Sequence, residues 1–239
     1  MLNHTFGPYA AIDRLGRKLP LPEKVGTLRE NRYVGMFYFI NLTWKKGMRP
    51  LKDNSKIWRE TPEAFMDVSH PVWETDGCYW GEPLFGYYEH GDEWVIRRHA
   101  MMLTMADVDF ILFDTTNLTM HRENALKVMK IFNEYQQAGW NVPKFAFYTN
   151  SEPGKRAQEI YENVYKAEMY PDVWFRPNGK PLLVGRPEFC SDEVKAFFDI
   201  RLTQWPTEHI KKEGALPWMA FERPQFVFVN KDGENEAMS

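Results

Sequence analysis

The stretch Val108-Asp-Phe-Ile-Leu-Phe-Asp114 decides the fold, because it is a short apolar run that ends in a carboxylate. A run without regular polar alternation is typical of a strand that is covered on both faces, as in parallel sheets. The segments on either side, 93–106 and 122–138, carry apolar residues at helical spacing. Helices that alternate with a buried strand predict parallel strands joined by crossover helices.

The same alternation extends outward from this unit in both directions. Asp92 and Ser191 are suited to cap the helices that follow them, and Gly139 is placed to end one. The segment 152–169 again has helical spacing. The 239 residues therefore predict one α/β domain, a TIM-type (β/α)8 barrel over residues 1–239. Its remaining strands are expected at 33–41, 144–150, 181–185, 199–203 and 225–230.

The strand count predicts that the barrel is not closed within this chain. A closed barrel has eight strands and typically about 250 residues, whereas six strands and a long insertion use up these 239 residues. The polar tail 230–239 adds no closing helix. A doubly wound sheet is the rival fold. The sequence, however, has no glycine-rich phosphate turn after its first strand, which disfavours that fold.

The segment 42–91 does not fit the alternation and is expected to be an insertion after the first strand. Loops in such folds usually have about 2 to 6 residues, and long loops at the carboxyl end of a strand are often functional. This one is rich in aromatic residues and punctuated by Pro, Gly and Asp. We expect a partly helical cap on the barrel, a binding segment, or both.

Composition excludes several classes of partner and cofactor. A net charge of -3 gives no reason to expect a nucleic acid or an anionic membrane, and no apolar run reaches the roughly 18 residues of a membrane span. Cys78 and Cys190 lie in no metal-binding pattern and are expected to be reduced thiols. No dinucleotide or phosphate-loop motif occurs, so neither a cofactor nor a metal is expected. Residues 1–5 lack signal-peptide features, and nothing bears on the oligomeric state.

The candidate site follows from the expected carboxyl ends of the strands, which meet at one edge of the barrel. The side chains there are polar and able to hydrogen-bond, with an aromatic ring among them. Amides and carboxylates bind pairs of sugar hydroxyls, and Trp packs on a sugar face. We therefore predict a carbohydrate substrate. The expected substrate-binding residues are Asn41, Asn117, Tyr148, Asn150, Gln204 and Trp205 at the strand ends, with Trp80 and Glu82 from the insertion.

Two carboxylates are the candidate catalytic residues. Asp114 stands at the end of an apolar strand, at the rim of the expected site. It is either a catalytic acid, base or charge stabiliser, or a structural residue of an Asx turn. Glu188 is the best-placed second carboxylate. Glu152 is an alternative, although an acid in a first helical turn is typical of capping. Glycosidases hold such a pair about 5 to 5.5 Å apart for retention and about 6.5 to 9.5 Å for inversion.

Several longer motifs resemble those of a family of bacterial glycoside-hydrolase-like proteins from polysaccharide-degrading Bacteroidetes, distantly similar to endo-α-mannosidase-type barrels. They are Arg32-Tyr-Val-Gly-Met-Phe-Tyr-Phe39, Trp80-Gly-Glu-Pro-Leu-Phe-Gly-Tyr-Tyr88, and the runs 92–100 and 106–117. The resemblance implies a (β/α)8 barrel, a carbohydrate substrate and a parent protein that is periplasmic or secreted. It also implies a catalytic Glu in a Trp-Asn-Glu-Trp-like segment, which this chain lacks.

The leading prediction is an O-glycoside hydrolase that is incomplete as this chain, with or without activity of its own. The alternative is a non-catalytic carbohydrate-binding barrel protein. A barrel aldolase is disfavoured, because no Lys stands at a strand end to form a Schiff base. A metal-dependent hydrolase is disfavoured, because the histidines do not have the spacing of metal ligands. His99 is expected to be a core histidine of its helix.

Overall fold

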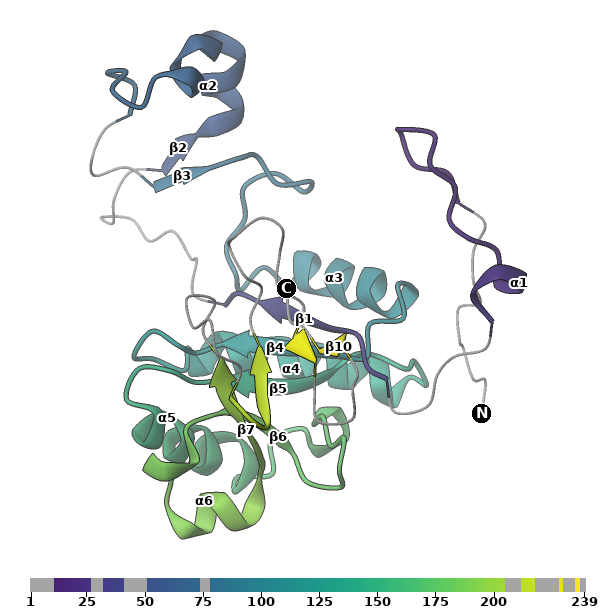
Figure 1. Ribbon diagram of the computed structural model, residues 1–239, viewed down its shortest axis with the longest axis vertical. Coiled ribbons are helices and arrows are strands. Elements are labelled where there is room, and N and C mark those ends of the chain that lie inside the picture. Colours follow the sequence, from purple (N-terminus) through teal and green to yellow (C-terminus); the bar gives the residue numbers. More distant parts are fainter. Residues whose placement is uncertain are drawn as a thin grey trace.

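The chain folds as a mixed α/β structure around one curled, half-barrel sheet (Figure 1). The computed structural model describes residues 11–26, 32–40, 51–73, 78–204, 212–217, 228–229 and 235–236. Within these residues six strands form the sheet, and every neighbouring pair is parallel. In sheet order they are β1 (Gly35–Tyr38), β4 (Phe110–Asp114), β5 (Lys144–Tyr148), β6 (Leu182–Gly185), β7 (Asp199–Gln204) and β8 (Ala215–Pro217).

Helices connect the successive strands from β1 to β7, as the sequence predicts. Asp92 caps the first of them by accepting a hydrogen bond from the Val95 N–H at 3.2 Å, and Ser191 caps the last in the same way. The expected helix 152–169 is broken by a π-helical turn, in which the Lys166 N–H bonds to the Tyr161 carbonyl. The bounds are α3 (Glu93–Met105), α4 (Arg122–Gln137), α5 (Pro153–Ile160), the π-turn η2 (Tyr161–Tyr165), η3 (Pro171–Val173), η4 (Pro187–Phe189) and α6 (Asp192–Phe197).

The sixth strand of the sheet is not the one expected from the sequence. Of the predicted strand 225–230 the structure describes residues 228–229, which form β9 (Phe228–Val229) and pair antiparallel with β10 (Asn235–Glu236) in a separate sheet. Instead β8 adds to β7, with Leu202 opposite Ala215. An apolar run indicates a strand but not its partner, and a three-residue strand that ends in proline is too short to show periodicity.

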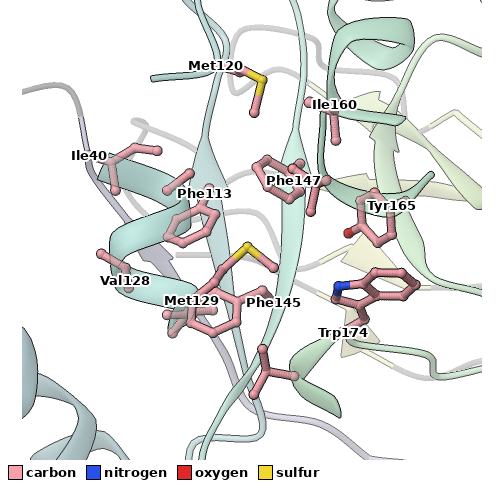
Figure 2. Packing of buried hydrophobic residues seen from close by; sticks show 14 of the residues in the cluster. Ile40, Phe113, Met120, Val128, Met129, Phe145, Phe147, Ile160, Tyr165 and Trp174 are labelled. Carbon is pink, nitrogen blue, oxygen red and sulfur yellow. The ribbon is translucent and has the colours of Figure 1, made fainter. Parts of the chain in front are cut away.

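One face of the sheet packs against the helices and forms the larger core (Figure 2). Phe113 of β4 and Phe145 of β5 stack with ring centroids 4.9 Å apart. Phe132 of α4 meets Phe145 edge to face at 5.1 Å. Tyr165 of η2 and Trp174 close the same core beside β5. Burial of these aromatic side chains is the main driving force for this half of the fold.

The opposite face of the sheet carries a second cluster without any helix residue. Because successive side chains of a strand point to opposite faces, Phe110, Leu112 and Asp114 share this face of β4. Their neighbours on β5 are Ala146 and Tyr148. This is the concave face of the half-barrel, since the helices cover the other one.

The segment between β1 and α3 forms a small unit outside the main sheet (Figure 1). In it β2 (Leu51–Asp53) pairs with β3 (Cys78–Trp80) in parallel. Between these strands in the chain lie α2 (Asn54–Glu60) and η1 (Pro62–Met66). Nearer the N-terminus lies the single-turn α1 (Pro22–Val25). A capping role for the insertion, and a single domain over 1–239, stay predictions. No described helix has the length and apolar character of a membrane span.

Candidate functional site

Asp114 stands at the carboxyl end of β4, on the concave face and in register with Tyr148 of β5. Only 5% of its surface is exposed. Its Oδ1 accepts two hydrogen bonds from Thr116, from the N–H at 3.0 Å and from Oγ1 at 2.7 Å. This is the Asx-turn arrangement. No described residue donates a hydrogen bond to Oδ2. Oδ1 therefore holds the loop, whereas Oδ2 takes no part in the turn.

The loop that follows β4 is anchored to its surroundings at several points. The Thr115 hydroxyl donates to the Tyr148 carbonyl at 2.7 Å, and the Ser151 N–H donates to the Thr116 carbonyl at 3.1 Å. Arg156, a buried residue of α5, donates to the Leu118 carbonyl and pairs with a glutamate on its own helix. These contacts hold Asn117, which is exposed, at the rim beside Asp114.

Aromatic rings line the concave face next to Asp114. The rings of Phe37 and Tyr148 lie 5.5 Å apart, and Phe37 stacks on Phe39 at 6.2 Å with an interplanar angle of 24°. Tyr148 is fully buried, whereas Phe39 is 42% exposed. These three rings, here called the aromatic strip, therefore extend from the interior of the sheet to the surface at the end of β1. Asn150 follows β5 and is exposed.

Glu188 lies on η4, which follows β6, rather than on a strand. Its side chain is exposed and pairs with Arg186, whose Nη2 lies 2.6 Å from Oε1. The Glu188 backbone N–H and the Arg186 guanidinium both lower the pKa of this carboxyl. A lowered pKa keeps Glu188 ionised, which suits a base or nucleophile and disfavours a general acid.

The end of β7 places two polar side chains on opposite faces. Gln204 shares its face with Ile200, which packs on the helix-side core. Gln204 is fully buried there, and its Oε1 accepts from the Lys212 N–H at 2.8 Å. The preceding residue, Thr203, points to the concave face and is 4% exposed. Sequence reasoning selected Gln204 and missed Thr203, although counting alternate residues from Ile200 would have found it.

The structure places the remaining candidates as follows. Asn41 and Trp205 lie outside the described residues, and of Trp80 only the backbone in β3 is described. Glu82 is exposed after β3, and its N–H donates to Ser55 of the small insertion unit. Glu152 stands at the N-cap position of α5, in line with the expected place at the helix start, but its side chain makes no capping hydrogen bond. Its carboxylate pairs instead with a lysine one turn along α5.

Comparison with family models, curated proteins and solved structures finds no match to this chain. The resemblance drawn from the sequence motifs stays a prediction, and function has to be argued from the site. Within the described ranges, no three His, Cys, Asp or Glu side chains are arranged to hold a metal ion.

A group of histidines and tyrosines lies where the end of β1 meets α3. His99 bonds to the Tyr38 hydroxyl through Nδ1 at 2.9 Å, and the Tyr88 ring meets the His99 ring edge to face. Burial lowers the pKa of His99. Burial also lowers the pKa of His90, and the neighbouring imidazoles of His121 and His99 lower it further. His99 is thus a hydrogen-bonded histidine of the packing, as expected from its helix position.

Because the pKa values of these histidines are lowered, we expect the protein to lose stability in mild acid. The folded-state pKa values of His90 and His99 lie below the ordinary value of about 6.5, so the unfolded chain binds more protons. Their contribution is complete above about pH 6.5 and is lost as the pH falls below it, by at most about 1.4 kcal/mol per pH unit for each histidine. Partial solvent contact keeps the slope below that limit.

Urea unfolding at a series of pH values between about 5 and 8 measures this dependence. The double variant His90→Gln with His99→Gln is the comparison, because glutamine keeps an amide in place of the imidazole but does not titrate. A variant with the same pH dependence as the original protein would show that these histidines are not its source.

Proposed function

We propose that this chain binds a carbohydrate at the carboxyl edge of its half-barrel and hydrolyses a glycosidic bond there, with Asp114 beside the reacting sugar. We further propose that the sheet is part of a TIM-type (β/α)8 barrel, in a parent protein that is periplasmic or secreted. The observation that carries the proposal is the placement of Asp114. It is an almost fully buried carboxylate at the end of an apolar strand, on the face that the helices leave open.

The surroundings of Asp114 suit the charge that develops in glycoside hydrolysis. The transition state resembles an oxocarbenium ion, and a carboxylate near it stabilises the positive charge or attacks it. The two bonds from Thr116 fix the orientation of Asp114. The apolar neighbours Leu112 and Phe37 exclude water on one side, which strengthens the electrostatic interaction.

Substrate binding would use the aromatic strip and the exposed amides at the rim. Sugar rings have apolar C–H faces that pack on aromatic side chains, and Phe39 offers such a surface next to Phe37. The amides of Asn117 and Asn150 each offer two donors and an acceptor for sugar hydroxyls. Glu188 is the proposed second carboxylate, and its lowered pKa suits the ionised role. With both carboxylates ionised, the departing oxygen takes its proton from water.

A non-catalytic carbohydrate-binding protein is the second candidate, and two observations favour it. Asp114 already serves an Asx turn through Oδ1. The Glu188 backbone N–H and the paired Arg186 guanidinium lower the pKa of this carboxyl, which disfavours the general-acid role of protonating a leaving group. On this alternative the concave face binds sugar without cleaving it.

The two candidates are separated by testing binding and cleavage on the full chain. The protein is applied to a printed array of oligosaccharides of mannose, glucose, galactose, xylose and fucose, and incubated with aryl glycosides of the same sugars. Binding with release of the aryl group supports the hydrolase, and binding without release supports the second candidate. No binding to any printed sugar would overturn both.

A further inference from the structure

The Thr203 hydroxyl is an unusual group in this fold, because it is buried and bonded to nothing described. Thr203 is the fifth residue of β7 and is 4% exposed. Its Oγ1 has no solvent contact and no hydrogen-bond partner among the described residues. A buried hydroxyl without a partner loses, on folding, the hydrogen bonds that it makes to water in the unfolded chain, and this costs stability. Nothing about the packing of β7 requires a hydroxyl there, since valine has the same shape.

The position of Thr203 connects this hydroxyl to the proposed sugar site. Val184 of β6 belongs to the cluster on the concave face, and its partner on β7 is Arg201. Thr203, two residues after Arg201, therefore lies on the concave face as well. Leu216 of β8 is its direct partner and is only partly buried, so the face is not closed on that side. Thr203 also lies close to the carboxyl end of its strand, as Asp114 does on β4.

We propose that Thr203 is a specificity-determining residue that hydrogen-bonds to a hydroxyl of the bound saccharide. The proposal rests on the proposed carbohydrate-binding function and extends the site from β4 and β5 to β7. A hydroxyl group both donates and accepts, so it matches the hydroxyls of a polyol. A site built to bond a substrate hydroxyl rejects the analogue that lacks it, because its own polar group is then left unpaired.

Thr149 provides a matched control directly after β5, two strands away from β7 in the sheet. It is also fully buried, but its Oγ1 donates to the Val184 carbonyl at 3.1 Å. Changing Thr149 to Val therefore removes a bond within the fold, whereas changing Thr203 to Val removes only an unpartnered hydroxyl. The same substitution has opposite expected effects at the two positions.

The test compares Thr203→Val and Thr149→Val in the full chain, by thermal unfolding and by titration with the oligosaccharide that binds most tightly on the printed array. Thr203→Val is expected to keep or raise the Tm and to weaken binding by about fivefold to tenfold, the effect of one hydrogen bond between uncharged groups. Thr149→Val is expected to lower the Tm by about 2–4 °C and to leave the affinity unchanged. Thr203→Ser, which keeps the hydroxyl, should restore most of the affinity.

Each outcome decides a separate point. Unchanged affinity in Thr203→Val, with the original protein binding the sugar, overturns the role of Thr203 and leaves the proposed function standing. A lowered Tm in Thr203→Val shows that the hydroxyl serves the fold and also overturns it. If the original protein binds no printed sugar, the proposed function fails and this inference fails with it.

Discussion

Asparagine in place of Asp114 is expected to lower the rate of glycoside hydrolysis by about a hundredfold or more. The amide keeps the shape of the carboxylate and one oxygen that accepts from Thr116, so the loop after β4 is preserved. The charge is lost, and with it the stabilisation of a cationic transition state. The measurement is kcat/KM on the aryl glycoside that the original protein cleaves, with circular dichroism to verify the fold.

Asp172→Asn is the matched control for this variant. Asp172 lies on η3, where its backbone carbonyl accepts from Lys144 at the amino end of β5, at the opposite edge of the sheet from Asp114. The same change of charge there is expected to leave the rate unaltered. If Asp114→Asn folds and cleaves at the original rate, the carboxylate has only its structural role in the Asx turn.

Alanine in place of Phe145 is expected to destabilise the protein by about 3–5 kcal/mol, the usual cost of deleting a large buried aromatic side chain. Phe145 is fully buried on the helix side of β5 and contacts the rings of Phe113 and Phe132. β5 lies between β4 and β6, so its neighbours cannot move in to fill the space without disturbing the sheet. The free energy of unfolding in urea measures the loss.

The control is Phe189→Ala, the same substitution on the exposed turn η4. Its ring is 58% exposed and lies against the Arg186 guanidinium. We expect a change of about 1 kcal/mol or less there. Equal losses at the two positions would mean that the helix-side core does not carry the stability of the sheet.

The central part of the fold could be predicted from the sequence because its strands are apolar on both faces. The runs 108–114 and 144–150 contain β4 and β5, and α4 between them has apolar residues at helical spacing and a glycine, Gly139, after its end. β8 could not be predicted, since three residues are too few to establish the two-residue alternation of a strand. The pairing of β9 with β10 was missed because composition does not specify a partner strand.

The candidate site was predictable to the level of the strand end but not of the individual side chain. Asp114 lies at its strand end, as the rule for parallel folds predicts, whereas the binding role of Asn117 stays a prediction. At β7 the predicted Gln204 lies on the helix side and the proposed Thr203 on the concave face, because a shift of one position moves a side chain to the other face. The ion pair of Glu188 with Arg186 depends on the turn η4, which short-range patterns do not reveal.

The anchored loop after β4 has a thermodynamic consequence for any ligand that touches it. Leu118 and His121 hold left-handed backbone angles, with φ of 60° and 47°, in a loop tied down by Arg156 and Ser151. Its conformational entropy is therefore lost when the chain folds. A ligand that contacts Asn117 does not have to order the loop again, and binding there should carry a small entropic penalty in calorimetry.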